Sequence, residues 1–599
     1  MDATGNDRWH AVVVPATLGL HEFVIEAWTD RYATWRHRAS ARLRARPPAG
    51  SPDEAGWLAD VNVDFEIGAG LLDAWMAGAA PHDRPHFAAA VEALRGADGD
   101  PRDRLDAALT PALAAATRGP LHHGEVTASA THMLWVDRER ALVGAWYELF
   151  PRSYGGLRGT IDRLPAIAAM GFDVVYLPPV HPIGRSFRKG RDNALVAGPD
   201  DPGSPWAIGA MEGGHTAIDP GLGTADDFRA LMAAAHDLGL EVALDYALQC
   251  SPDHPWARDH PEWFHHRPDG TIAHAENPPK KYEDIYPLNF CPELDRDRMA
   301  LWAACKAIVD HWLGEGVRIF RVDNPHTKPV AFWEWLIPAV QAAHPDAVFL
   351  AEAFTRPKMM AKLAEVGFSQ SYTYFTWRTV KLGDEGLVAY VEELANGPKA
   401  DFMRPNFWPN TPDILSGPLR HGSLAAFRLR LLLAATLVPS YGIYSGYELG
   451  ENEPASDANE EYRHSEKYEL RVRDWDAPRS LAPFITLVNT IRRRHPALWR
   501  LRNIRFHHAA SDDILCFSKS SVVLDDVMLV VVNLDPVHPH DCWLGLDLAA
   551  LGLAPDQPFE VFDELTGQTF RWVGANPYVR LDPSVAPAHL LHLRAGPAA

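Results

Sequence analysis

The sequence of 599 residues predicts an α/β protein organised around a (β/α)8 TIM barrel with loop insertions. Three observations predict this fold class. Eight short apolar runs alternate with stretches of helical spacing between about residues 140 and 495. Two consecutive runs, ending at Asp323 and Glu352, are separated by a single predicted helix, as in one βα repeat. The longest insertions follow predicted strands, where the loops of such barrels build an active site.

Composition and charge limit the classes of function. Hydrophobic residues make up 47% of the chain and the net charge is −21, which is typical of a soluble globular protein and opposes binding to nucleic acid or to an anionic membrane. The first residues are polar and acidic, and no run approaches the ~20 apolar residues that cross a bilayer. The five cysteines form no CxxC pair, which fits a reducing cytoplasm. We therefore expect a cytoplasmic protein without nucleic-acid or membrane partners.

Residues 1–32 are predicted to form a partial N-terminal β-sandwich. Two apolar stretches, at residues 9–15 and 20–28, have the character of strands. Two strands alone are marginal in water. The family resemblance given below implies a fuller sandwich at this end, so either the sequence starts late or this protein has lost strands.

Residues 33–125 are predicted to form a helical insert, because alanine, leucine and arginine recur there at helical spacing. Four apolar residues of the insert look exposed: Leu71, Leu72, Trp75 and Met76. A two-fold contact commonly buries such a helix face, so we expect a homodimer. Surface helices without a partner are the alternative interpretation.

Residues 126–495 are predicted to form the barrel. Its eight strands are expected at residues 145–150, 173–177, 240–246, 317–323, 347–352, 368–371, 402–408 and 440–445. Long insertions follow the second, third and eighth strands, and the one at about 247–297 predicts a B-type subdomain. Residues 496–599 carry apolar runs separated by turn residues, which predicts a C-terminal antiparallel β-sandwich.

Arg321 and Asp323 form the first candidate pair of functional residues. They lie two positions apart at the end of an apolar run, so both side chains emerge on the same face of a strand. A neighbouring guanidinium holds a carboxylate ionised and fixes its direction, and an aspartate held in this way can act as a nucleophile. An isolated Arg-x-Asp can also be a structural ion pair.

Glu352 ends the next predicted strand and is expected beside Asp323, because neighbouring parallel strands end at the same edge of a barrel. Two carboxyls there can lie ~5–5.5 Å apart, the separation that retaining glycosidases use. Near other carboxylates, Glu352 should keep its proton and be able to donate it. Asp413 follows a further apolar strand and is the third acid.

Several segments resemble one family. Phe320–Asp323, Ala351–Phe354 and Asn410–Asp413 resemble the catalytic motifs of the α-amylase clan, glycoside hydrolase family 13. Within that clan the chain is most similar to the α-1,4-glucan:maltose-1-phosphate maltosyltransferases, through the segments Gly144–Arg152, Phe187–Arg191, Asn277–Tyr282, Val322–Lys328 and Ser465–Tyr468. The resemblance implies that Asp323 is the nucleophile, Glu352 the general acid and base, and Asp413 the transition-state stabiliser.

The resemblance also implies which residues bind the donor. Positions matching Asn277, Lys280, Tyr282 and Asn324 contact phosphate in the family, and those matching Lys189, Gln249, Lys467 and Tyr468 hold the second glucose. Local cations are needed, because a pocket lined by carboxylates repels a phosphate dianion. A single loop lysine is more often a solvated charge, and Lys281 is interpreted in that way.

Two departures separate the sequence from ordinary amylases. Gln249 and Cys250 stand where amylases continue the segment after Asp245 to an Asn-His pair. The segment ending at Asp413 lacks the usual histidine. Asp245 itself can contact sugar or hold Arg321, and the residues leave both roles open.

The resemblance therefore implies a retaining transferase that moves maltosyl units from α-maltose 1-phosphate to the non-reducing end of α-1,4-glucans, with inorganic phosphate as the product. An amylase, a trehalose synthase or another glucanotransferase is the nearest alternative, since one fold supports several reactions. The second alternative is a glucan-binding protein without catalytic activity. The C-terminal sandwich would be a structural cap or an accessory glucan surface.

No cofactor and no metal are expected. The pairs His122-His123 and His265-His266 lack ligand spacing. Neither a G-x-G-x-x-G nor a Walker A string is present, so nucleotide binding has no support.

Overall fold

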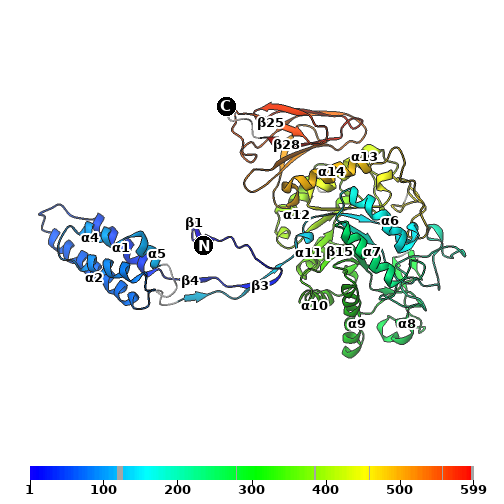
Figure 1. Ribbon diagram of the computed structural model, residues 1–599, viewed down its shortest axis with the longest axis horizontal. Helices are drawn as coiled ribbons and strands as arrows, with labels where there is room; N and C mark the ends of the chain where they lie inside the picture. Colours follow the sequence, from blue (N-terminus) through cyan, green and yellow to red (C-terminus); the bar gives the residue numbers. More distant parts are fainter. Residues whose placement is uncertain (118–125, 278–279, 384–385, 458, 556, 595–599) are drawn as a thin grey trace. The chain divides into compact units, whose positions relative to one another are not determined.

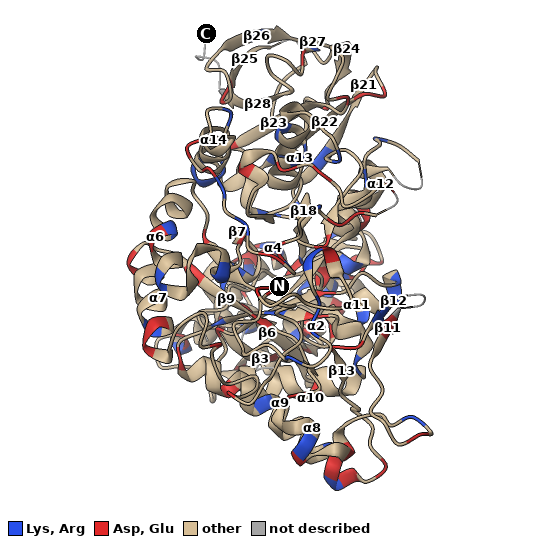
Figure 2. Cartoon of the chain, turned by 90° about the vertical axis from the view of Figure 1, so that its right-hand side faces the viewer, with Lys and Arg blue, Asp and Glu red and all other residues tan. Residues whose placement is uncertain are grey.

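The computed structural model describes residues 1–117, 126–277, 280–383, 386–457, 459–555 and 557–594. The chain divides into two compact units, one of residues Leu20–Val136 and one of Met1–Gly19 with Asp137–Ala599. None of the helices in the described ranges is long and apolar enough to cross a bilayer. Basic and acidic residues are interspersed along the chain (Figure 2).

The smaller unit combines two short antiparallel strand pairs with a helical bundle. Strand β3 (Gly19–Phe23) pairs with β6 (His132–Val136), and β4 (Glu26–Trp28) pairs with β5 (Val126–Ala128). The helices are α1 (Arg31–Arg44), α2 (Glu54–Met76), α3 (Arg84–Arg95), α4 (Pro101–Ala108) and α5 (Pro111–Ala116). Trp35 and Phe65 are central to their core. Gly68 permits the close approach of α1 to α2, because a Cβ at this position would overlap the Trp35 ring.

Two expectations about the N-terminal region are wrong. The expected strand at residues 9–15 is only the end of a short hairpin of β1 (Asp2–Gly5) and β2 (Arg8–His10), and Val12, Val13 and Val14 are 77%, 77% and 85% exposed. A β-branched run does not form a strand when no neighbour supplies hydrogen bonds. Leu72 is not exposed but fully buried, because it packs in the core of the bundle.

The predicted (β/α)8 barrel is confirmed. Its parallel strands close in the order β14-β15-β16-β17-β20-β7-β8-β9. Their bounds are β7 Gly144–Glu148, β8 Val174–Leu177, β9 Glu241–Tyr246, β14 Ile319–Asp323, β15 Val348–Glu352, β16 Gln370–Tyr372, β17 Pro405–Phe407 and β20 Ser440–Tyr444. The main surrounding helices (Figure 1) are α6 Gly156–Ala169, α7 Ala225–Asp237, α9 Asp295–Gly314, α10 Val330–Gln341, α11 Pro357–Glu365, α12 Leu387–Asn396, α13 Leu424–Leu437 and α14 Ala482–Arg494.

The barrel interior is filled by large side chains, so it is a packed core and not a pore. Trp146, Tyr176, Tyr372 and Trp408 belong to one buried cluster inside it. A Cβ on Gly442 would overlap the Trp408 ring, so strand β20 needs glycine there. The functional chemistry is therefore confined to the end of the barrel where the strands finish.

The insertion after β9 carries its own small elements. These are β10 (Gln249–Cys250) paired with β13 (Tyr286–Pro287), β11 (Ala275–Asn277) paired with β12 (Lys280–Tyr282), and the helix α8 (Pro255–Asp259). The insertion stands on the same end of the barrel as the strand termini, because it begins directly after β9 ends.

The C-terminal region forms an antiparallel sheet in the order β26-β25-β28-β23-β22-β21-β24-β27. The strands are β21 Ile504–Ala509, β22 Ile514–Ser520, β23 Val527–Asn533, β24 His540–Gly545, β25 Pro558–Asp563, β26 Thr569–Val573, β27 Tyr578–Leu581 and β28 Ala588–Arg594. One face contributes Phe517, Met528 and Val530 to the core that it shares with the barrel helices. The sheet lies beside α13 and α14 (Figure 1).

Candidate active site

Asp323 and Glu352 are the last residues of neighbouring strands β14 and β15 and are paired directly across the parallel register. Parallel strands lie ~4.8 Å apart, so the two carboxylates rise side by side at the mouth of the barrel. Their side chains are only 10% and 12% exposed. The sequence pattern therefore placed both acids at one edge of the barrel, as the fold requires.

Arg321 links three carboxylates beneath this edge. Its Nη1 lies 2.9 Å from Asp323 Oδ1 and 2.9 Å from Asp245 Oδ2, and its Nη2 lies 3.4 Å from Glu352 Oε1. Tyr176 donates a hydrogen bond of 2.6 Å to Asp245 Oδ2. Asp245 is fully buried on Arg321, so the geometry favours its structural role over a sugar contact.

The environment of Glu352 favours its protonated form. Burial raises the pKa of this carboxyl to about 8, Arg321 opposes the shift, and the negative charges of Asp323 and Asp413 add to it. The backbone N–H of Asn324 donates to Glu352 Oε2 at 3.2 Å and fixes the side chain. A carboxyl that keeps its proton near neutral pH can serve as a general acid.

The segment after β14 holds Asn324 in a strained but supported conformation. Its φ of 43° is left-handed, a region that asparagine tolerates better than most residues. The Lys328 ammonium donates to the carbonyls of Asp323 and Asn324 at 3.1 Å each, and Lys328 is buried. Lys328 thus anchors the turn that presents Asn324 beside the two acids.

A cavity of about 700 Å³ opens above these strand ends. It collects nine of the residues predicted from the sequence: Lys189, Gln249, Tyr282, Asp323, Asn324, Glu352, Asp413, Lys467 and Tyr468. Arg321 lies below it and reaches the cavity only through its carboxylate partners. The structure therefore brings together residues from seven separate stretches of the chain.

Two predicted donor-binding residues cannot be placed in the same way. Asn277 and Lys280 are paired in the backbone of β11 and β12, but their side chains lie outside what the structure describes. Lys281 is exposed, while Lys189 is 2% exposed with its ammonium 3.5 Å from the carbonyl of Lys281. The loop of Lys280 is thereby tied to the wall of the cavity.

Lys467 forms an ion pair with Asp413, and both side chains line the cavity. Burial lowers the pKa of the Lys467 ammonium, but Asp413, Tyr468 and Glu461 together more than offset burial and raise this pKa well above its ordinary value. The ammonium also lies 5.9 Å from the Trp206 ring and 5.5 Å from the Tyr468 ring. Lys467, Trp206 and Tyr468 therefore form a cationic and aromatic part of the cavity wall, next to the Asp413 carboxylate.

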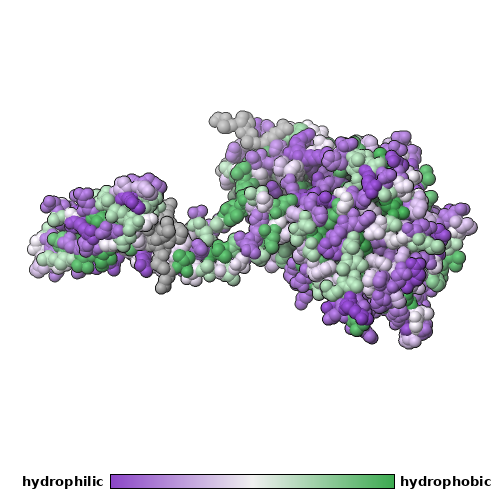
Figure 3. Space-filling model, turned by 60° about the horizontal axis from the view of Figure 1, so that its bottom comes forward, coloured by the Kyte–Doolittle hydropathy of each residue, from purple (hydrophilic) through white to green (hydrophobic). Residues whose placement is uncertain are grey.

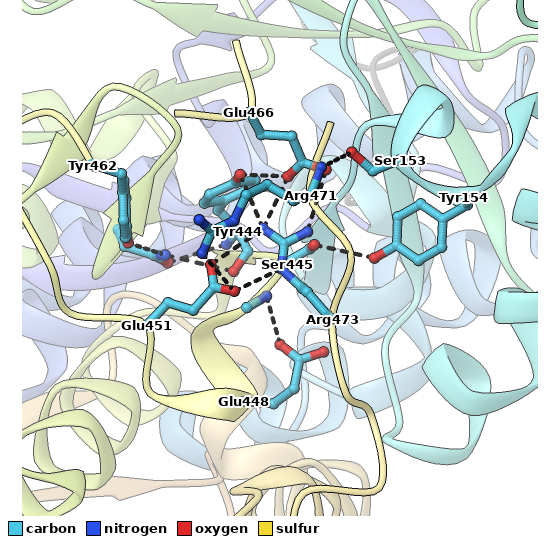
Figure 4. A network of polar contacts seen from close by, with 12 residues as sticks. Ser153, Tyr154, Tyr444, Ser445, Glu448, Glu451, Tyr462, Glu466, Arg471 and Arg473 are labelled. Atoms are coloured by element: carbon cyan, nitrogen blue, oxygen red, sulfur yellow. Dashed lines mark hydrogen bonds and ion pairs between the residues drawn. The ribbon is translucent and has the colours of Figure 1, made fainter. Parts of the chain in front are cut away.

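A buried polar network surrounds Glu466, the residue directly before Lys467 (Figure 4). Arg473, with a side chain 2% exposed, bonds Glu466 Oε2 at 3.0 Å and Glu451 Oε1 at 2.9 Å. Arg152 Nη2 donates to the carbonyl of Glu466 at 2.6 Å. Glu466 is thus held through both its side chain and its backbone, directly before Lys467.

The same network reaches the strand that leads to Asp413. The backbone N–H of Tyr444 donates to Asn410 Oδ1 at 3.1 Å, and Asn410 Nδ2 donates to Tyr462 at 2.8 Å. The hydroxyl of Tyr444 in turn bonds Glu466. Tyr444 on β20 therefore contacts both segments that carry the ion pair: Asn410, three residues before Asp413, and Glu466, directly before Lys467.

Sequence reasoning missed several residues of the cavity. Trp206, Asp284, His326 and Phe354 also line it. Asp284 is 2% exposed, and its Oδ1 has no hydrogen-bond partner among the described residues. His326 and Phe354 stand within three residues of Asp323 and Glu352, so proximity to the acids was the available signal. Trp206 and Asp284 lie in loops, where no periodicity marks them.

A second cavity of about 440 Å³ lies beside the loops after β7 and β8. It is lined by Arg152, Arg185 and Arg188 but by none of Asp323, Glu352 and Asp413. We place the chemistry in the larger cavity, because that one holds the carboxylates.

Potential metal ligands gather in three places in the described part of the chain: His215 with Cys250 and His254, His495 with Glu564 and His592, and Asp192 with His464 and Glu469. In the first group, His254 Nδ1 accepts the N–H of Trp256, so its Nε2–H donates to His215 Nδ1 at 3.1 Å. These hydrogen bonds occupy the nitrogen lone pairs that a metal would need. His122 and His123 lie outside the described residues.

Three family models match the chain. The model described as "Alpha-1,4-glucan:maltose-1-phosphate maltosyltransferase, domain N/S" matches residues 1–138. "Alpha amylase, catalytic domain" matches residues 144–329, and "GLGE, C-terminal" matches residues 506–593.

Relatives match over almost the whole chain. Alpha-1,4-glucan:maltose-1-phosphate maltosyltransferase 2 of Streptomyces coelicolor is 54% identical over 606 residues, covering 99% of this chain and 87% of that protein. The protein so named in Mycolicibacterium smegmatis is 49% identical, covering 98% of this chain and 84% of the relative.

Solved structures show the same fold at low identity. An α-amylase from Lactobacillus plantarum has a TM-score of 0.56 and 20% identity, covering 76% of this chain and 99% of that chain. An α-amylase from Geobacillus thermoleovorans, complexed with acarbose, has a TM-score of 0.56 and 16% identity, covering 76% of this chain and 98% of its own. At such identities the likeness speaks for the fold alone.

Proposed function

This chain belongs to the α-1,4-glucan:maltose-1-phosphate maltosyltransferase family, and we propose from this membership and from its acid cluster how it transfers maltosyl units. The donor is α-maltose 1-phosphate, the acceptor is the non-reducing end of an α-1,4-glucan, and inorganic phosphate is released. Neither a metal nor a cofactor takes part in the scheme.

The observation that carries the mechanism is the sharing of Arg321 by Asp323 and Glu352. Arg321 pairs with Asp323 at 2.9 Å and orients it, so this carboxylate can attack the anomeric carbon. As that bond forms, the bond from the anomeric carbon to the phosphate oxygen breaks, and Glu352 protonates the departing oxygen. A β-maltosyl ester on Asp323 results.

The second half of the reaction reverses these roles. Glu352, now deprotonated, removes the proton from the 4-hydroxyl of the acceptor while that oxygen attacks the anomeric carbon. The ester bond to Asp323 breaks, and two inversions give net retention. Asp413 is assigned the stabilisation of positive charge that develops on the sugar ring.

We propose two groups of donor contacts. Asn277, Lys280, Tyr282 and Asn324 bind the phosphate, and Lys189, Gln249, Lys467 and Tyr468 bind the second glucose. Tyr282 and Asn324 line the same cavity as the nucleophile, which supports the first group. The ring of Tyr468 beside the Lys467 ammonium supports the second, because an aromatic face and a donor together suit a sugar.

Incubation of the purified chain with α-maltose 1-phosphate and glycogen tests this function. Release of phosphate with lengthening of outer chains is expected. Shortening of the glucan would favour an amylase instead. Binding of glycogen without turnover would favour a glucan-binding protein.

We also propose a homodimer, through a face of α2 other than the one expected. Ala59, Val63, Ile67, Gly70 and Ala74 recur at helical spacing and are all exposed. Val63 is 59% and Ile67 47% exposed, and green hydrophobic patches are visible on the surface of the helical unit (Figure 3). Light scattering of the wild type should give twice the chain mass of 66.4 kDa. The variant Ile67→Asp should give the mass of a single chain. A monomer before substitution would contradict the proposal.

A domain division and a location complete the proposal. The chain is divided into residues 1–32, 33–125, 126–495 and 496–599. A hydrophobic cluster of its own supports the helical insert as a division, and the C-terminal sheet has one cluster of its own besides the core that it shares with the barrel. Limited proteolysis should cut near these limits.

A cytoplasmic location is supported by the five free cysteines, and fractionation of cells that express the chain tests it.

A further inference from the structure

An aromatic pair is exposed on the C-terminal sheet, far along the chain from the acids. Trp543 on β24 is 60% exposed and Tyr578 on the edge strand β27 is 47% exposed. The two residues face each other directly in the antiparallel register. Exposed tryptophan of this extent is uncommon, because the indole is among the largest apolar surfaces a side chain offers.

The geometry of the pair leaves ring surface open. The ring centroids are 5.4 Å apart and the planes meet at 63°. In an edge-to-face pair only the edge of one ring covers the other, so the remaining ring faces stay accessible. Tyr578 donates a hydrogen bond of 2.8 Å to Asp541 Oδ2, which fixes the tilt of its ring.

Polar groups flank the rings on the same face of the sheet. Along β24 and β27 the exposed residues alternate with buried ones, so Asp541, Trp543, Tyr578 and Arg580 all point outward. Asp541 and Arg580 stand opposite each other in the register. We call these four residues the aromatic platform. Its one carboxylate and one guanidinium leave it without net charge.

We propose that the aromatic platform is an accessory binding site for the α-1,4-glucan acceptor, a site that the catalytic scheme does not include. Two inclined rings suit consecutive glucose units of a curved chain, since the apolar face of each sugar ring stacks on an aromatic face. Asp541 and Arg580 supply an acceptor and donors for sugar hydroxyls. A platform without net charge complements an uncharged polymer on a protein whose net charge is −21.

The alternative role of the pair is sheet stabilisation, since cross-strand aromatic pairs stabilise a sheet by themselves. The two roles make different demands. A stabilising pair matters equally with any acceptor, whereas an accessory site matters only for acceptors long or branched enough to reach it and the active site together. The inference rests on the proposed function, because it takes the glucan as substrate.

The test compares long and short acceptors in Trp543→Ala. Retardation in native gels that contain glycogen should fall, with the dissociation constant rising by about tenfold, the scale set by loss of a stacking ring. KM for glycogen should rise likewise, while kcat/KM for maltohexaose stays within about twofold. Trp543→Phe should keep part of the affinity. Trp9→Ala is the matched control, because Trp9 is 61% exposed outside this sheet.

Two results would overturn the inference. One is glycogen retardation unchanged in Trp543→Ala. The other is an equal loss with maltohexaose and with glycogen, accompanied by a lower melting temperature, which would mean that the pair only stabilises the sheet. Gel retardation needs no turnover, so it separates this inference from the proposed function: an unaltered chain that binds glycogen but transfers no maltosyl unit would contradict the latter alone.

Discussion

The guanidinium of Arg321 lies 2.9 Å from the carboxylate of Asp323, two positions along the same strand. Because Arg321 is 6% exposed and also bonds Asp245, it cannot turn away from Asp323 without leaving a buried charge unpaired. The side chain of Asp323, the proposed nucleophile, is therefore oriented before any substrate binds.

The first prediction concerns Asp323→Ala. Transfer should fall by about 10⁴-fold or more, the scale seen when a covalent nucleophile is removed. The fold should persist, because Arg321 retains Asp245 and Glu352 as partners. Phosphate release measures the first effect and circular dichroism the second. Substantial residual transfer by the folded variant would remove Asp323 from the nucleophile role.

The second prediction concerns pH. Glu352 must be protonated to assist departure of phosphate, and its pKa is raised to about 8 by burial. The rate constant kcat/KM should therefore fall as pH rises through about 8. Glu352→Gln has no acidic proton to donate, so its activity should fall by ~10²–10⁴-fold. Because glutamine does not titrate, the decrease of kcat/KM near pH 8 should also disappear. A variant that keeps the wild-type profile would contradict the assignment.

The same shift predicts a dependence of stability on pH. The pKa in the folded chain exceeds the ordinary value of 4.5, so between these two values the folded state binds more protons than the unfolded state. The contribution of Glu352 to the free energy of unfolding is complete below pH 4.5 and is lost as pH rises to about 8. Urea titrations of the wild type and Glu352→Gln across this window measure the difference.

The placement of Asp323 and Glu352 was predictable from sequence because local periodicity determines it. Arg321 and Asp323 share a strand face, and one βα repeat sets Asp323 beside Glu352. The contacts of the loops were not predictable. Arg152 and Glu466 are 314 positions apart, and no pattern in the sequence joins them. Likewise, the sequence around Leu72 does not show whether this face of α2 is exposed to solvent or packed against α3. Only the tertiary packing of the bundle buries Leu72.

The third prediction separates phosphate recognition from sugar recognition. Lys280→Ala should lower kcat/KM for α-maltose 1-phosphate. The loss should correspond to ~2–5 kcal/mol of transition-state stabilisation, the cost of leaving a desolvated charge unpaired. Use of α-maltosyl fluoride, which lacks phosphate, should change little. Lys281→Ala is the matched control, because Lys281 is exposed. An equal loss with both donors would show that Lys280 does not read the phosphate.

The fourth prediction concerns the network behind Lys467. Glu466→Gln keeps the shape of the side chain but leaves Arg473 with less opposing charge. KM for α-maltose 1-phosphate and the dissociation constant of maltose should rise by about tenfold, while the dissociation constant of phosphate stays unchanged. Glu315→Gln, which removes a distant ion pair to Arg229, is the control. Parallel weakening of maltose and phosphate binding would point to a general loss of structure instead.

The central claim is a covalent maltosyl ester on Asp323, and mass spectrometry of the trapped ester tests it most directly. The variant Glu352→Ala is treated with 2-deoxy-2-fluoro-α-maltosyl fluoride, whose leaving group needs little protonation and whose ester hydrolyses slowly. The account predicts one added 2-deoxy-2-fluoromaltosyl group, mapped to Asp323 in the peptide digest. A group on any other carboxylate, or unmodified protein after stoichiometric release of fluoride, would contradict it.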